Sequence, residues 1–198
     1  MKYLNQHEYA HIPYMTRVKK EGVTREEMMN NVSRSGCGPC SICMLIDIMT
    51  DKHLEIEECI RISEECGANH GVGTDLRILG PVIADKFGLD FIKTNDLDEA
   101  INYLRMGAQI VVHVRVKEGE PLGLFTKRGH YMLLTATDGK EFCILDPSYS
   151  PEKYTIPERV GRVDISHAPY LYCDVNVTHN ETIAVDGRTK YYVFKRKR

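Results

Sequence analysis

Apolar side chains recur at helical spacing through the first half of the chain. In residues 38–49, four of them fall on one side of a helix: Ile42, Leu45, Ile46 and Met49. Pro39 stands in the first turn, where a helix tolerates proline, so Cys37 is expected at or just before the helix start. The same spacing predicts further helices over residues 24–29, 54–66, 74–88 and 96–107, with Thr24 and Thr74 as caps of the two that contain them.

After residue 107 the hydrophobic period changes from that of a helix to that of a strand. The segment AQIVVHVRV, residues 108–116, alternates in the manner of a strand. The segment GHYMLLTATDGKEFCILDP, residues 129–147, predicts a hairpin that turns at Asp138 and Gly139. More strands are expected over residues 170–177, 182–185 and 191–194. Helices come first and an antiparallel sheet follows, which is the α+β pattern.

The composition fits one domain with a sizeable core. The chain has 198 residues, of which 42% are apolar, and it shows no internal repeat. We therefore expect residues 1–198 to form a single domain. Its helical lobe should cover about residues 24–106, and its sheet lobe about residues 108–194.

The net charge bears on which partners the protein can bind, and the cysteine content bears on the compartment in which it is found. A net charge of −2 gives no basic surface for nucleic acid, and no apolar run approaches the roughly 18 residues of a membrane span. The first 15 residues contain no apolar stretch of the kind found in a secretory signal. Seven cysteines, an odd number with three of them crowded into residues 37–43, favour free thiols in a reducing cytoplasm.

The segment SGCGPCSICM, residues 35–44, is compatible with several kinds of chemistry. Cys37 and Cys40 form the Cys-Gly-Pro-Cys tetrad of thiol–disulfide exchange proteins, but there the tetrad follows a buried strand, whereas residues 25–36 are polar. The C-x2-C-x2-C spacing also suits a metal cluster, which needs a fourth thiolate. Cys40 and Cys43 fit better as buried packing residues on the apolar side of the helix, so no metal site is predicted.

Nucleophilic catalysis by Cys37 needs partners from elsewhere in the chain. A helix N-terminus favours the thiolate, and a histidine held by a third group completes the activation. The hairpin supplies both partners, because His130 begins its first strand and Asp146 ends its second. A loop over residues 137–139 would set His130 opposite Asp146 on one face, whereas an even-numbered loop would place them on opposite faces.

These motifs together resemble the papain-like cysteine peptidases of the bacteriocin leader-peptidase type, a group related to the double-glycine peptidases. The resemblance rests on SGCGP before an apolar helix, GVGT before a later helix, and FTKRGHYMLLTATDG followed by ILDP, and it covers about residues 30–150. It implies a papain-like fold, in which an N-terminal helical lobe packs on a C-terminal antiparallel sheet. It also implies that Cys37 is the nucleophile, His130 the general base and acid, and Asp146 the carboxylate that orients His130.

Two positions depart from the family pattern. The family usually has a glutamine shortly before the cysteine as an oxyanion-hole donor, and none lies between Gln6 and Cys37. Asn31 is therefore the candidate donor, with Asn30 next, and the second donor would be the backbone N–H of Cys37. Cys40 stands where a small residue is more common, which keeps the redox alternative open.

The resulting hypothesis is hydrolysis of a peptide or amide bond through a thioester acyl-enzyme, without a cofactor. An acyltransferase or transpeptidase would use the same three residues but deliver the acyl group to an amine or thiol. A catalytically degenerate relative would bind a peptide and stop there. Thiol–disulfide exchange predicts instead a reversible bridge between Cys37 and Cys40.

Overall fold

The computed structural model describes residues 1–14, 30–69, 73–182 and 188–197. The helices of these residues are η1 (Gln6–Tyr9), α1 (Val32–Ser35), α2 (Cys37–Met49), α3 (Ile56–Glu65), α4 (Leu76–Phe87), α5 (Leu97–Arg105), α6 (Pro151–Thr155) and α7 (Val175–Asn180). The strands are β1 (Leu89–Thr94), β2 (Gln109–Arg115), β3 (Gly129–Thr137), β4 (Glu141–Leu145), β5 (Tyr170–Asp174) and β6 (Tyr191–Arg196).

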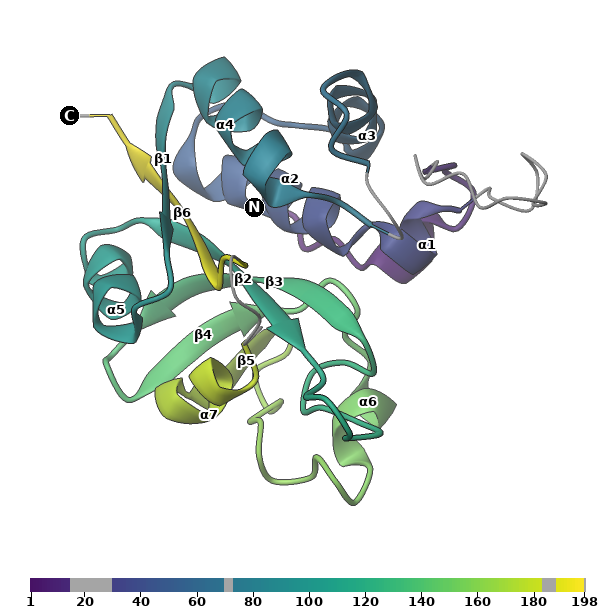
Figure 1. The fold of residues 1–198 in the computed structure, drawn as a ribbon, viewed down its shortest axis with the longest axis vertical. Coiled ribbons are helices and arrows are strands. Elements are labelled where there is room, and N and C mark those ends of the chain that lie inside the picture. Colours follow the sequence, from purple (N-terminus) through teal and green to yellow (C-terminus); the bar gives the residue numbers. More distant parts are fainter. Residues whose placement is uncertain (15–29, 70–72, 183–187, 198) are drawn as a thin grey trace.

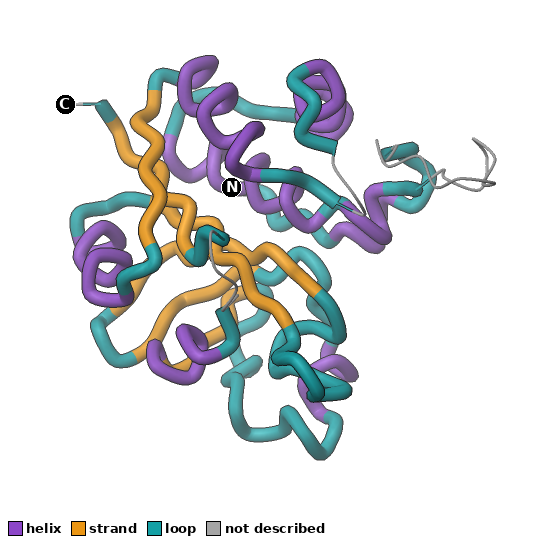
Figure 2. Tube along the Cα trace, in the orientation of Figure 1, coloured by secondary structure: helices purple, strands orange, loops and turns teal. Residues whose placement is uncertain are grey.

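One antiparallel sheet separates two groups of helices, as Figures 1 and 2 show. The strand order is β1-β6-β2-β3-β4-β5, and each neighbouring pair is antiparallel. Helices α1 to α4 pack on one face, where their apolar side chains meet Val111, Leu133 and Phe194. Side chains of α5, α6 and α7 pack on the other face. The expected α+β, papain-like arrangement of a helical lobe on an antiparallel sheet is therefore confirmed.

The helices predicted within the described residues are found, with one change in capping. Helix α2 begins at Cys37, as expected, and ends at Met49. Asp75, not the expected Thr74, caps α4, because its carboxylate accepts a hydrogen bond from the N–H of Arg77. The hydroxyl of Thr74 is instead engaged with Tyr14 at 2.6 Å in the core. The predicted helix over residues 24–29 lies outside the described residues.

The strand predictions need two corrections, and a third predicted strand lies mostly outside the described residues. Strand β1 was not expected, although it pairs along its full length with β6. The segment 170–177 is part strand and part helix, because the Asp174 carboxylate accepts from the N–H groups of Asn176 and Val177 and starts α7. Of the predicted strand 182–185, Thr182 forms a single bridge with Val114, and the rest lies outside the described residues.

The register of the β3–β4 hairpin also differs from the prediction. The last paired positions of the two strands are Thr137 and Phe142, so four residues lie between them, where the prediction had three. A bulge between Leu134 and Ala136 then shifts the register by one residue, and Leu133 pairs with Leu145. The even-numbered loop alone would move the side chains of β4 to the opposite face of the sheet, and the one-residue bulge reverses that change. Each side chain therefore stays on the predicted face. Continued past β4, this register would place Ser148 opposite His130, with Asp146 diagonal to it.

The N-terminal segment joins the two lobes. On the helical side, the N–H of Leu4 lies 3.4 Å from the sulfur of Met44, and the side-chain amide of Gln6 donates to the carbonyl of Ser33 at 2.7 Å. On the sheet side, the hydroxyl of Tyr3 and the N–H of Gln6 donate to the carbonyls of residues 146 and 147. These contacts tie the start of the chain to the segment that follows β4.

We predict that Gly80→Ala destabilises the protein by about 1–3 kcal/mol, because the added methyl group would overlap the ring of Phe91 where α4 packs on β1. Chemical denaturation measures the change. Val82→Ala on the exposed side of the same helix is the matched control and should change the free energy of unfolding by less than about 1 kcal/mol. Equal effects of the two substitutions would contradict the packing of α4 against β1.

Candidate active site

Cys37 lies at the N-terminus of α2, where the chain turns out of α1 through Gly36. The side chain is partly exposed, and its sulfur accepts hydrogen bonds from the N–H groups of Gly38 and Tyr131. Burial raises the pKa of the Cys37 thiol, but the hydrogen bond and charge of His130, together with these two N–H groups, outweigh that effect. The net result is a lowered pKa, which favours the thiolate.

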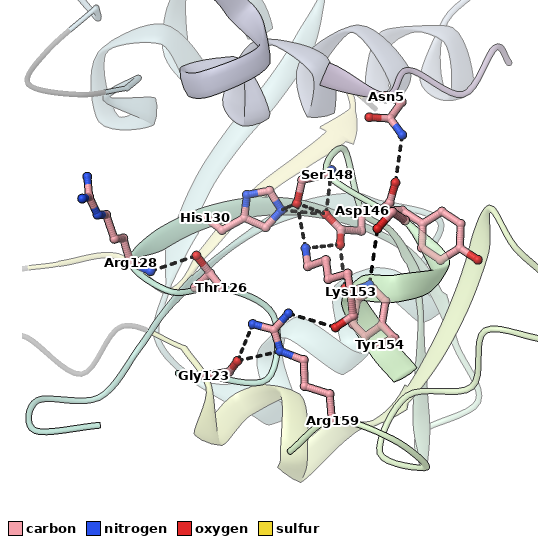
Figure 3. A network of polar contacts seen from close by, with 12 residues as sticks. Asn5, Gly123, Thr126, Arg128, His130, Asp146, Ser148, Lys153, Tyr154 and Arg159 are labelled. Atoms are coloured by element: carbon pink, nitrogen blue, oxygen red, sulfur yellow. Dashed lines mark hydrogen bonds and ion pairs between the residues drawn. The ribbon is translucent and has the colours of Figure 1, made fainter. Parts of the chain in front are cut away.

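His130 connects this sulfur to a buried carboxylate. It lies near the start of β3, is 6% exposed, and donates from Nε2 to Oδ1 of Asp146 at 2.6 Å (Figure 3). Because Nε2 is engaged there, Nδ1 is the ring nitrogen left for the hydrogen bond with Cys37. Burial and the nearby Lys153 lower the pKa of His130, whereas Asp146 and Cys37 raise it, and the net shift is upward.

Asp146 directly follows β4 and is fully buried. Its Oδ1 accepts hydrogen bonds from His130 and from the N–H of Ser148 at 2.9 Å, and Ser148 Oγ lies 3.2 Å away. Its Oδ2 accepts from Lys153 Nζ at 2.5 Å and from the hydroxyl of Tyr154 at 2.6 Å. Burial raises the pKa of this carboxyl, but Lys153 and His130 lower it more, so the pKa falls well below its usual range and Asp146 is ionised.

The structure thus brings together Cys37, His130 and Asp146, the three residues singled out from the sequence. Sequence reasoning missed Ser148, Lys153 and Tyr154, which hold the carboxylate. A signal for two of them was present. Ser150 caps α6 and Pro151 opens it, a common start of a helix, and recognising this helix would have placed Lys153 and Tyr154 close after Asp146.

Three side-chain amides lie near the start of α2, and that of Asn30, the second candidate from the sequence, donates to the hydroxyl of Ser35. Asn31, the candidate from the sequence, caps α1, with its Oδ1 accepting from the N–H of Arg34 at 3.1 Å. Gln6 is 6% exposed, and its Nε2 donates to the carbonyl of Ser33 at 2.7 Å. That carbonyl lies four residues before Cys37 and is the one the Cys37 N–H would bond if α1 continued into α2. Gln6 therefore brings its side-chain amide to the turn that precedes α2.

The other cysteines of this region are packing residues. Cys40, Cys43 and Cys59 are each at most 1% exposed, and every cysteine of the chain is a free thiol. Burial raises the pKa of Cys40 well above the usual value for a thiol. Within the described residues, no three His, Cys, Asp or Glu side chains gather in a way that would hold a metal ion. The described helices also include none that is long and apolar enough to span a membrane.

The fold is shared with solved peptidase structures. The peptidase domain of Streptococcus ComA, a bifunctional ABC transporter involved in quorum sensing, aligns at a TM-score of 0.52 and 12% identity over 94% of this chain and 100% of that domain. A protein from Bacillus anthracis described as a C39-like peptidase aligns at a TM-score of 0.54 and 10% identity over 96% of each chain. No family model and no curated protein sequence matches the chain. At these identities the likeness establishes the fold.

We predict that iodoacetamide modifies Cys37 at a lower pH than an ordinary thiol, and that His130→Ala raises the pH at which the reaction begins. The reason is that His130 is the main group opposing the effect of burial on the Cys37 pKa. Alkylation rates measured against pH by mass spectrometry of the Cys37 peptide test this. His53→Ala, which changes an exposed histidine on another part of the surface, is the control and should leave the profile unmoved. An identical profile for wild type and His130→Ala would contradict the described contact.

Proposed function

We propose that the protein is a cysteine peptidase or amide hydrolase that uses Cys37, His130 and Asp146. The observation that carries this proposal is the continuous chain of contacts from a partly exposed sulfur at a helix N-terminus, through an imidazole, to a buried and ionised carboxylate. The fold shared with two peptidase structures supports the same chemistry. The substrate class is a peptide or another amide. The free thiols fit a reducing compartment, and we place the protein in the cytoplasm.

The proposed reaction proceeds in two steps. In the first, the Cys37 thiolate attacks the carbonyl carbon of the amide, and His130 gives its proton to the leaving nitrogen as the carbon–nitrogen bond breaks. This leaves a thioester on Cys37 and a neutral imidazole. In the second, His130 takes a proton from water, the resulting hydroxide attacks the thioester, and the acid is released as the thiolate re-forms. Asp146 holds His130 in one tautomer and orientation throughout.

The negative oxygen formed in each step needs hydrogen-bond donors. We propose the N–H of Cys37 as one donor, because the first residue of a helix has no carbonyl partner within that helix. We propose Gln6 as the second, since its Nε2 carries a second hydrogen beyond the one donated to Ser33. Asn31 is the competing amide, and its oxygen is engaged in capping α1.

Cys37→Ala should abolish hydrolysis of a peptide library, and Asp146→Ala should lower kcat by about 10²-fold, because His130 would lose the carboxylate that holds its orientation. Product analysis by mass spectrometry measures both variants. Cys66→Ala replaces a cysteine elsewhere in the helical lobe and should retain full activity. Hydrolysis that survives Cys37→Ala would disprove the assignment. Transfer of the acyl group to added glycinamide, in preference to water, would identify a transferase with the same residues.

Gln6→Ala should lower kcat by about 10²-fold with little change in KM, because a donor to the oxyanion acts mainly in the transition state. Asn31→Ala should instead lower stability by about 1 kcal/mol, as expected for loss of a helix cap, and leave kcat close to wild type. Steady-state kinetics and thermal unfolding of both variants separate the two amides. The reverse pattern would assign the donor to Asn31.

A further inference from the structure

A lysine is buried against the carboxylate of the proposed triad. Lys153 is in the single turn α6, and its side chain is 12% exposed. Its Nζ lies 2.5 Å from Oδ2 of Asp146 and 2.7 Å from Oγ of Ser148. Figure 3 draws both contacts as dashed lines. The guanidinium of Arg159 donates to its backbone carbonyl at 3.0 Å and to the carbonyl of Gly123, which ties this turn to the loop before β3. None of the proposed proton transfers uses this lysine.

With Lys153 in place, the Asp146 carboxylate contacts two side chains that can carry a positive charge. One oxygen of Asp146 faces His130 and the other faces Lys153, so each oxygen has its own positively charged partner when the imidazole is protonated. Two further polar groups, Tyr154 on α6 and Ser148 on the segment between β4 and α6, bond the same carboxylate without adding charge. A carboxylate buried with a single cation would attract that cation's proton more strongly than one shared between two.

Other charged and titratable groups around this pair differ from Lys153 in position or charge. His113, on the neighbouring strand β2, interacts electrostatically with His130, and burial lowers its own pKa to about 4. Cys37, on α2, forms a hydrogen bond with the side chain of His130. The hydroxyl of Tyr3 donates to the backbone carbonyl of Asp146 from the N-terminal segment. Arg159 is a second cation near Asp146, but its side chain is engaged by the carbonyls of Gly123 and Lys153. Lys153 is therefore the cation in direct contact with the carboxylate on the side away from His130.

We propose that Lys153 is a positioning residue, which fixes the Asp146 carboxylate and offsets its negative charge so that His130 can release its proton to the leaving group. This inference rests on the proposed function. Without the lysine, the carboxylate would hold the imidazolium more tightly, and the ring would be a weaker acid in the first step. A neutral donor in the same place would keep the geometry but would not offset the charge.

The first experiment measures the protonation of His130 directly and needs no turnover. In the Cys37→Ala background of the full chain, the NMR signal of the His130 ring is followed against pH. Lys153→Met and Lys153→Gln should each raise the midpoint by about one pH unit, because both remove the charge. Lys153→Arg should leave the midpoint unchanged. Tyr154→Phe removes a neutral donor from the same oxygen and should move it by much less.

The result that overturns the proposal is a His130 midpoint that stays in place in folded Lys153→Met or Lys153→Gln. A shift in Lys153→Met alone also overturns it, because Gln keeps a donor and lacks only the charge. Far-ultraviolet circular dichroism establishes that each variant is folded. If Lys153→Met does not fold, Lys153→Gln and Lys153→Arg decide the question between them.

The second experiment connects the charge to catalysis. With Cys37 intact, the alkaline limb of the kcat/KM profile should move up by about one pH unit in Lys153→Gln and remain in place in Lys153→Arg. Lys140→Met, at an exposed position of the β3–β4 hairpin, is the control and should leave the profile unchanged. An unmoved limb in Lys153→Gln contradicts this inference alone, whereas hydrolysis that survives Cys37→Ala contradicts the proposed function itself.

Discussion

The burial of the Asp146 carboxylate constrains the positions of the side chains around it. A fully buried Asp146 is costly unless each oxygen is paired, and the structure meets that requirement with His130 and Ser148 on one oxygen and with Lys153 and Tyr154 on the other. These partners come from β3, from the segment after β4 and from α6. The same bonds that make the burial tolerable therefore determine where the imidazole lies, so the stability of this region and the geometry of the site cannot be varied independently.

The site is divided between the two lobes. The sulfur of Cys37 comes from the helical lobe, and His130 comes from the sheet. Their contact forms where α2 packs against β3. Tyr131 contributes to this packing with its side chain, which lies in the core, and its backbone N–H donates to the sulfur of Cys37. Packing in this core consequently sets the distance between the reacting groups, and small displacements of such groups have large effects on rate.

The sequence predicted this site where local signals were sufficient. Cys37 could be placed because Pro39 and a regular apolar repeat define the start of one helix. The hairpin was predicted but its register was not, because the bulge near Thr135 depends on how the strand curves over the core. Lys153 and Gln6 were missed for different reasons. For Gln6 the partner Ser33 is 27 residues away, and only the folded chain brings the two together, whereas Lys153 was missed because the short helix α6 was not recognised.

The opening residues of the chain have a mechanical role that follows from their contacts on both sides of the molecule. Gln6 contacts both lobes: its side-chain amide donates to the carbonyl of Ser33, and its backbone N–H donates to the carbonyl of Pro147. The hydroxyl of Tyr3 donates to the carbonyl of Asp146. The N-terminal segment therefore holds the two lobes together, because their separation would break these hydrogen bonds. A movement that drew Cys37 away from His130 along this boundary would break the hydrogen bonds that this segment makes to both lobes.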